Sequence, residues 1–306
     1  MNQNSKLKKV ESNIFYLDSR RLSKFGVSGV YLVVGEGITL IETGTTLNGP
    51  ALLESIREIG FQEKDVKRAI VTHIHLDHAG ATGWLVQRLP HLEVYVHEKG
   101  LEHMHDPTKL LDSALTVYGN FETIIAAHGE ILPVPRENLI SVTETDLDAG
   151  NGVRLKMFDA PGHAYHHLCV YEPETGCLFS GEALGHYEPE TDTISPALAP
   201  PAFDYEAALA TIDKIEALDP RLVCFSQFGQ RGDTKFVIEK SKRQLNHYYE
   251  LIRTNLKKGL NAEEVIEEIW RASSKKSEED QEITRGMLVS VVHAYQIYFR
   301  RIGEVK

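Results

Sequence analysis

The sequence predicts a layered α/β protein with a helical C-terminal segment. Short apolar runs typical of buried strands recur at residues 69–72, 177–180 and 222–226, and residues 154–158 alternate between polar and apolar like a strand. Stretches with the apolar spacing of helices lie between and after these runs. Each run ends in a loop with side chains that could bind metal or substrate, and catalytic groups of layered α/β proteins usually lie on such loops.

Helices are predicted on either side of these strands. The first has apolar residues at helical spacing, namely Leu52, Leu53, Ile56 and Ile59. Between Lys99 and Pro135 the pattern loosens around several leucines, which predicts a helical insertion that leans over the site. A later helix begins at the N-cap residue Asp204. Its apolar face consists of Ala208, Leu209, Ile212 and Ile215.

From about residue 236 the chain becomes charged and helical. One apolar stripe there consists of Leu245, Tyr248, Tyr249 and Ile252. Gly259 ends this stripe, and a second stripe follows toward the C-terminus. We therefore predict a main domain at residues 1–235 and a helical appendage at residues 236–306. The aromatic stripes are expected to pack in the core, with a homodimer contact as the alternative.

The segment from Thr72 to Gly80 carries the strongest chemical signal. Three imidazoles and one carboxylate fall within six positions, namely His73, His75, Asp77 and His78. If residues 69–72 form a strand, the first two histidines leave its end on the same side and can bind one ion. The adjacent Asp77 and His78 point differently and can reach a second ion. The segment therefore predicts half of a dinuclear metal site, and a solvated histidine-rich loop is the alternative.

Later segments supply candidates for the other half. Pro161-Gly162-His163 breaks the strand-like run 154–158 and presents a histidine. Glu182 follows the run 177–180, and Gln227 follows the run 222–226. Each potential ligand therefore lies where a predicted buried strand ends.

Together these residues carry a resemblance to a known family. The string His73-x-His75-x-Asp77-His78, followed by Pro161-Gly162-His163 and then by Ser180 to Leu184, resembles the metallo-β-lactamase superfamily. Upstream, residues 30–34 and 38–44 resemble the opening hairpin of that fold. The similarity covers roughly residues 13 to 230. It implies a four-layer αββα sandwich, here with a C-terminal helical appendage.

The resemblance implies a set of metal ligands. His73, His75 and His163 would hold a first metal, and Asp77 and His78 a second. Glu182 stands where the family usually has a bridging aspartate. Gln227 replaces the family's last histidine, and its amide oxygen is a poorer ligand for zinc or iron than an imidazole. One or two divalent ions are expected, zinc first, with iron or manganese as alternatives.

Four further residues are candidates for supporting the site or contacting substrate. Glu42 stands where aspartate is usual in the first hairpin, and it either orients a ligand or caps the turn. His167, close behind the predicted ligand His163, falls where the family often carries a supporting histidine. His186 could replace the missing imidazole, contact substrate or lie in an exposed loop. Tyr165 could donate a hydrogen bond to a substrate carbonyl.

Composition narrows the class of protein. In 306 residues, of which 42% are hydrophobic, no stretch approaches the ~20 apolar residues that a membrane span requires. The N-terminus has no apolar segment typical of a secretory signal, and three cysteines do not suggest a disulfide framework, so we expect a cytoplasmic protein. With a net charge of -11 and no sizeable basic cluster near the motifs, nucleic acid is not expected as a partner. A small-molecule substrate is expected instead.

The predicted activity is hydrolysis by a metal-activated water. Bound cations lower the pKa of water from ~16 toward ~7, and Asp77 would orient that nucleophile and shuttle its proton. An ester, lactone, thioester or amide would fit equally well. Two alternatives are iron-dependent oxygen or sulfur chemistry, in a dioxygenase-like or diiron protein, and a non-catalytic metal-binding protein.

Overall fold

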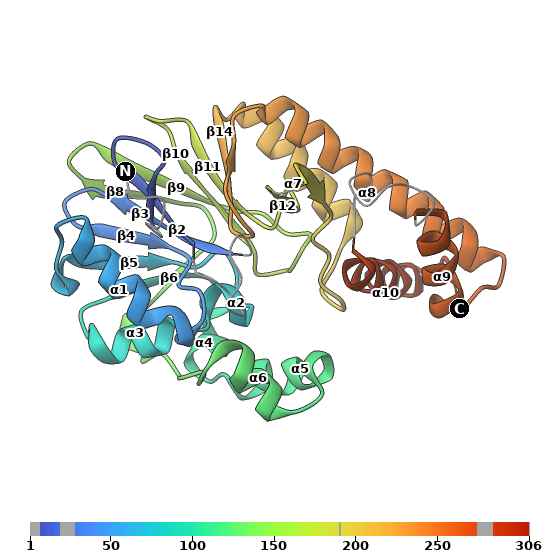
Figure 1. Cartoon of the computed structure of the whole chain (residues 1–306), viewed down its shortest axis with the longest axis horizontal. Coiled ribbons are helices and arrows are strands. Elements are labelled where there is room, and N and C mark those ends of the chain that lie inside the picture. Colours follow the sequence, from blue (N-terminus) through green and yellow to red (C-terminus); the bar gives the residue numbers. More distant parts are fainter. Residues whose placement is uncertain (1–6, 19–27, 190, 274–283, 306) are drawn as a thin grey trace.

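Two β-sheets stack face to face, and helices cover the outer face of each one (Figure 1). The computed structural model describes residues 7–18, 28–189, 191–273 and 284–305. Three separate apolar clusters fill the space between the sheets and the space between each sheet and its helices. The predicted four-layer αββα sandwich with C-terminal helices is therefore confirmed.

The first sheet has seven strands, whose order in the sheet is their order in the chain. They are β1 (Leu7–Lys9), β2 (Ile14–Asp18), β3 (Gly29–Val34), β4 (Ile38–Ile41), β5 (Val66–Ile70), β6 (Glu93–His97) and β7 (Leu139–Val142). The strands from β1 to β4 pair antiparallel and contain the predicted opening hairpin, whereas those from β4 to β7 pair parallel. Parallel neighbours need long crossover connections, and one of these crossovers carries the histidine motif.

The second sheet has six strands in the order β15-β14-β11-β10-β9-β8. They are β8 (Thr145–Gly150), β9 (Val153–Asp159), β10 (Leu168–Glu172), β11 (Cys177–Gly181), β14 (Leu222–Phe225) and β15 (Gln230–Arg231). The runs predicted at residues 154–158, 177–180 and 222–226 correspond to β9, β11 and β14. A separate ribbon consists of β12 (His186–Glu188) and β13 (Thr193–Ser195).

The inner faces of the two sheets enclose one apolar layer. In β9, Leu155 and Met157 are buried while Arg154 and Lys156 are exposed, because alternate residues of a strand point to opposite faces. Aromatic rings cross this layer: Tyr31 of β3 meets Phe179 of β11 edge-on, with ring centroids 5.1 Å apart. Packing of this kind makes the sandwich a rigid support for the loops at its edge.

Helices are found at each predicted position. They are α1 (Gly49–Glu58), α2 (Leu76–Ala79), α3 (Thr82–Arg88), α4 (Leu101–His105), α5 (Thr108–Tyr118), α6 (Phe121–His128), α7 (Tyr205–Leu218), α8 (Thr234–Lys257), α9 (Ala262–Ser273) and α10 (Arg285–Arg301), of which α2, α3 and α9 are additional. Asp204 caps α7 as predicted, since its side chain accepts a hydrogen bond from the Ala207 N–H at 3.0 Å. The predicted insertion is helical and consists of α4 to α6. Met104 of α4 belongs to the same apolar cluster as Ile74 and Ala79, so the insertion packs against the loop that carries the histidines.

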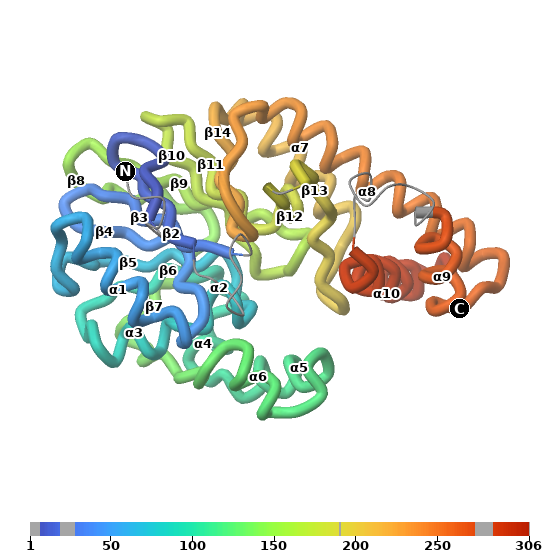
Figure 2. Tube along the Cα trace, in the orientation of Figure 1, coloured from blue at the N-terminus to red at the C-terminus, as the bar shows by residue number. Residues whose placement is uncertain are grey.

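The C-terminal helices pack on the second sheet rather than standing apart. Figure 2 shows α7 to α10 on the far side of that sheet from the first sheet. Leu245, Tyr248 and Ile252 of the predicted stripe are buried in a cluster that also contains Phe225 of β14. Core packing of the predicted aromatic stripe is thereby confirmed, whereas α9 was not predicted. The domain boundary at residue 235 and the homodimer stay predictions.

One expected strand end is wrong. The run 69–72 was predicted to be extended through Thr72, but β5 ends at Ile70. The Val71 N–H still donates to the Tyr95 carbonyl of β6 at 3.1 Å, but the Thr72 carbonyl accepts a hydrogen bond from the Leu168 N–H of the second sheet at 2.7 Å. His73 and His75 therefore lie on a loop between β5 and α2, not on the end of a strand.

Candidate metal centre

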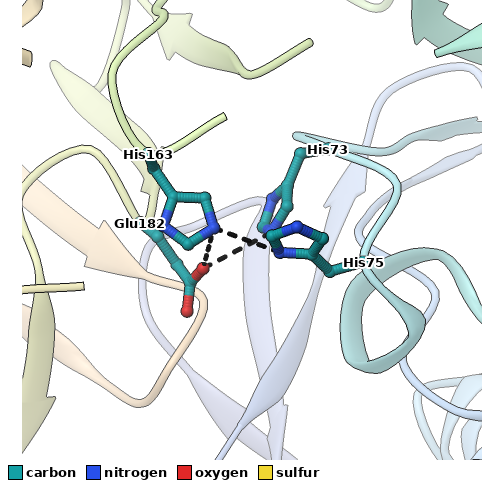
Figure 3. A group of neighbouring side chains, drawn as sticks. All are labelled: His73, His75, His163 and Glu182. Carbon is teal, nitrogen blue, oxygen red and sulfur yellow. Dashed lines mark hydrogen bonds and ion pairs between the residues drawn. The ribbon is translucent and has the colours of Figure 1, made fainter. Parts of the chain in front are cut away.

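Side chains from both sheets converge at one edge of the sandwich. Figure 3 shows His73 and His75 from the first half of the chain pointing toward His163 and Glu182 from the second half. His163 lies on the loop after β9, and Glu182 directly follows β11. One ligand-type atom from each of these four residues lies within 4.8 Å of the other three.

The distances inside this four-residue cluster are short. The Nε2 atom of His163 lies 3.1 Å from Nδ1 of His75 and 2.6 Å from Oε2 of Glu182. The same carboxylate oxygen lies 3.4 Å from Nε2 of His73. Ligand atoms around a tetrahedral zinc ion with bonds of about 2.1 Å lie about 3.4 Å apart. The distances of 3.1 and 3.4 Å are close to this spacing, whereas the 2.6 Å between His163 and Glu182 is the distance of a hydrogen bond.

Hydrogen bonds behind two of the histidines determine which nitrogen faces the cluster. Nδ1 of His163 donates to the Ala197 carbonyl at 2.8 Å, which leaves Nε2 directed at the cluster. The Thr72 hydroxyl donates to Oε1 of Glu42 at 2.5 Å and therefore accepts from Nδ1 of His73, 3.0 Å away. Within the described residues, Nε2 of His73 is buried without a hydrogen-bond partner. A buried nitrogen lone pair beside imidazoles and a carboxylate fits a metal ligand.

The charges of the cluster match this interpretation. Burial lowers the pKa of His73 well below its usual value, as it does that of His75, so both imidazoles keep their lone pairs at neutral pH. Burial acts the same way on His163, but Glu182 outweighs it and raises that pKa. Burial opposes ionisation of Glu182, yet His163 and His186 hold its pKa well below the usual value. Positive charge, as a proton or a cation, is thus favoured among these atoms.

Glu42 lies behind the histidines in a fully hydrogen-bonded pocket. Its carboxylate accepts from the Thr72 hydroxyl and N–H and from the Ser226 hydroxyl, the last at 2.8 Å. Nδ1 of His78 lies 3.2 Å from the same carboxylate. Glu42, His73 and His78 form a second geometric group of ligand-type residues, but the Glu42 oxygens already have donors. Thr72 and Ser226 were not predicted as site residues, although each directly precedes a candidate ligand in the sequence.

Asp77, His78 and Gln227 form a separate group beside the cluster. The Gln227 amide donates to Oδ2 of Asp77 at 2.7 Å, and the same nitrogen lies 3.1 Å from Nε2 of His78. Burial lowers the pKa of His78, but Asp77 and Glu42 outweigh it and raise the pKa well above the usual value. The structure thus places the residues predicted to hold a second metal next to one another, with the Gln227 amide in contact with both Asp77 and His78.

The remaining candidates lie at different distances from the cluster. His167 is buried, and its Nε2 accepts a hydrogen bond from the Glu182 N–H at 3.0 Å. His186 contacts Glu182 directly, with its Nε2 2.5 Å from Oε1. Tyr165 is 45% exposed and contacts His166, whose pKa burial lowers to about 2. Tyr165 thus lies at the rim of the site.

Comparison with known proteins agrees with this geometry. The model of the metallo-beta-lactamase superfamily matches residues 24–227, which include every ligand candidate named above. The chain belongs to the metallo-beta-lactamase superfamily. Among the described residues, no helix is both long and apolar enough to span a bilayer.

Similar members of the superfamily come from archaea and bacteria. A metallo-beta-lactamase fold-containing protein of Sulfurisphaera tokodaii is 26% identical over 251 residues, 78% of this chain and 86% of that protein. A probable metallo-hydrolase of Bacillus subtilis is 23% identical over 265 residues, 79% of this chain and 80% of the other. The solved structure of a metallo-beta-lactamase family protein of Thermus thermophilus has a TM-score of 0.67 at 21% identity, covering 90% of this chain and 89% of that one. At that identity the solved structure supports the fold alone.

Proposed function

We propose that the protein is a hydrolase that uses a metal-activated water on a small-molecule ester, lactone, thioester or amide. The observation that carries the proposal is the buried Nε2 of His73, which has no hydrogen-bond partner in the described part of the chain and lies beside His75, His163 and Glu182. A buried polar atom without a hydrogen bond is costly, and a cation at this position would satisfy it. Relatives named as probable metallo-hydrolases support the same reaction class.

Zinc is the metal we propose, with iron or manganese as alternatives. Three imidazoles and a carboxylate are ordinary zinc ligands, and imidazole also suits iron. Metal binding requires neutral imidazoles, and burial keeps His73 and His75 in that form. The proton shared by His163 and Glu182 would leave when the ion binds.

In the proposed reaction the chain's own residues hold the nucleophile and move its proton. A divalent cation at the cluster would lower the pKa of water there toward ~7 and so supply a nucleophile at neutral pH. Asp77 is 14% exposed in its side chain and lies beside the cluster, so its carboxylate can accept a proton from an incoming water. The Gln227 amide holds one oxygen of that carboxylate and fixes its orientation.

The proposed substrate is small and not a nucleic acid. The formal net charge of -11 disfavours binding of phosphate backbones, which needs clustered lysine and arginine. We also propose that the protein acts in the cytoplasm. Measuring turnover on a panel of esters, lactones, thioesters and amides would identify the class of substrate.

The test is a His75→Ala variant compared with a His247→Ala control. His247 is exposed on α8, away from the cluster, so its removal leaves the site unchanged. We expect His75→Ala to lose bound metal and at least ~100-fold in turnover, and the control to keep both. Equal metal content and turnover in the two variants would contradict the proposal.

Elemental analysis of protein purified without added metal separates the alternatives. Zinc together with turnover on the panel supports hydrolysis. Iron with a visible absorption band supports oxygen or sulfur chemistry instead. Bound metal without turnover above that of free ions would identify a binding protein.

A further inference from the structure

The atoms that would hold a second cation are already engaged with N–H groups. Asp77 and His78 were expected to reach a second ion beside the His73, His75 and His163 cluster. Oδ2 of Asp77 instead accepts a hydrogen bond of 2.7 Å from the Gln227 amide. Gln227 is itself buried, with 7% of its surface exposed, so this bond is shielded from water.

His78 has no free lone pair for a second ion. Its Nδ1 faces the Glu42 carboxylate at 3.2 Å, so this nitrogen carries a hydrogen. In the neutral imidazole, Nε2 accepts from the Gln227 amide, 3.1 Å away. In the cationic imidazole, Nε2 carries a second hydrogen and faces Oδ2 of Asp77 at 3.4 Å. A hydrogen therefore occupies the space in front of Nε2 in both forms.

Glu182 directs its two oxygens to different partners. Oε2 faces the histidine cluster, 2.6 Å from Nε2 of His163. Oε1 lies 2.5 Å from Nε2 of His186 and 3.7 Å from Nε2 of His78. The oxygen that could bridge toward a second ion is therefore held by His186.

The position between His73, His75, His163 and Glu182 differs, because it offers a nitrogen that no hydrogen bond within the described residues occupies. Nε2 of His73 is buried without a hydrogen-bond partner among the described residues, whereas Asp77, His78 and Oε1 of Glu182 all have one. A second ion would have to break the bond between Gln227 and Asp77 and leave a buried amide unpaired. That loss weakens binding by about 10- to 100-fold.

We infer that the Gln227 amide takes the place of a second cation, and that the protein binds a single metal ion at His73, His75, His163 and Glu182. Gln227 is then a positioning residue, which orients Asp77 through its N–H group. The inference rests on the proposed metal-dependent function. It goes further by fixing the number of ions and the role of a residue that sequence reasoning treated as a weak ligand.

The experiment is a titration of the metal-free full-length protein with ZnCl2 by calorimetry, repeated with CoCl2 by visible absorption. Wild type is compared with Gln227→His, which offers an imidazole, and with Gln227→Ala, which only removes the amide. Gln87→His is the matched control, because Gln87 is exposed on α3 and adds a histidine away from the site. Turnover is recorded separately.

We expect saturation at about one ion per chain in wild type and in the control, and at about two in Gln227→His. Gln227→Ala should bind a second ion about 10-fold or more tightly than wild type does. Two ions of similar affinity in wild type would overturn the inference and leave the metallohydrolase proposal standing. The inference would also be overturned if Gln227→His and Gln227→Ala both bound only one ion. If Gln227→His does not fold, the result for Gln227→Ala decides by itself. Single-ion binding without turnover would support the inference while the proposed hydrolysis failed.

Discussion

Replacement of Thr72 by valine tests how much its hydrogen bonds to Glu42 and His73 contribute to stability and to zinc affinity. The hydroxyl of Thr72 is fully buried, donates to Oε1 of Glu42 at 2.5 Å and accepts from Nδ1 of His73 at 3.0 Å. Valine has nearly the same shape, so the change removes two hydrogen bonds and little packing. It leaves the Nδ1–H of His73 without its partner, while Oε1 of Glu42 keeps Ser226 and His78.

The expected loss in the free energy of unfolding follows from the two hydrogen bonds that valine cannot make. A hydrogen bond to a charged group contributes ~1.5–3 kcal/mol, and a buried group left without a partner costs ~1–3 kcal/mol. We therefore expect Thr72→Val to lower the free energy of unfolding of the metal-free protein by about 2.5–6 kcal/mol. Since the hydrogen bond on Nδ1 orients His73, zinc affinity should fall by about 10- to 100-fold.

The assay is urea unfolding followed by circular dichroism, with zinc affinity measured by calorimetry. Thr39→Val is the matched control, because Thr39 is equally buried on β4 and its hydroxyl has no hydrogen-bond partner within the described residues. The control should be neutral or slightly stabilising. If Thr72→Val matched Thr39→Val in both stability and zinc affinity, the assignment of His73 as an oriented ligand would be refuted.

Two further predictions concern pH and backbone geometry. The pKa of Glu182 is lowered and that of His163 is raised, so their ion pair should stabilise the metal-free protein at mildly acidic pH. This contribution is lost as the pH falls through the pKa of Glu182 or rises through the pKa of His163. Zinc affinity should rise with pH, because zinc displaces the proton of this pair. Thermal unfolding from about pH 3 to about pH 9 with and without zinc checks this, and a flat profile would contradict it. Gly181→Ala should destabilise by about 2 kcal/mol or more, because Gly181 has φ of 55° and an added Cβ would lie 2.4 Å from Nε2 of His167. Gly119→Ala, with φ of 81° but nothing within 4 Å, measures backbone strain alone, and an equal loss in both would disprove the clash.

Local patterns in the sequence were sufficient for most of the elements. Alternation of apolar and polar residues predicted β9, and the cap at Asp204 predicted the start of α7, because both signals act within a few residues. The end of β5 was wrong by two residues. The Thr72 carbonyl bonds to the other sheet there, and such a contact between distant segments leaves no trace in local periodicity.

The sequence by itself determined which residues were candidates for the metal centre. His73, His75 and His163 carry a family resemblance and lie after strand-like runs, which brings such side chains to the same edge of a layered fold. Their type and spacing indicate metal chemistry before any contact is known.

Only the tertiary structure decided how each candidate is used. The nitrogen that each histidine presents depends on partners far away in the chain, such as Ala197 for His163. The contact of Gln227 with Asp77 joins residues 150 positions apart, and it turns a weak ligand into a hydrogen-bond donor. These roles depend on differences of a few tenths of an ångström in the distances between chain segments. Such distances are set by the packing of two sheets against each other, not by the residues next to each side chain.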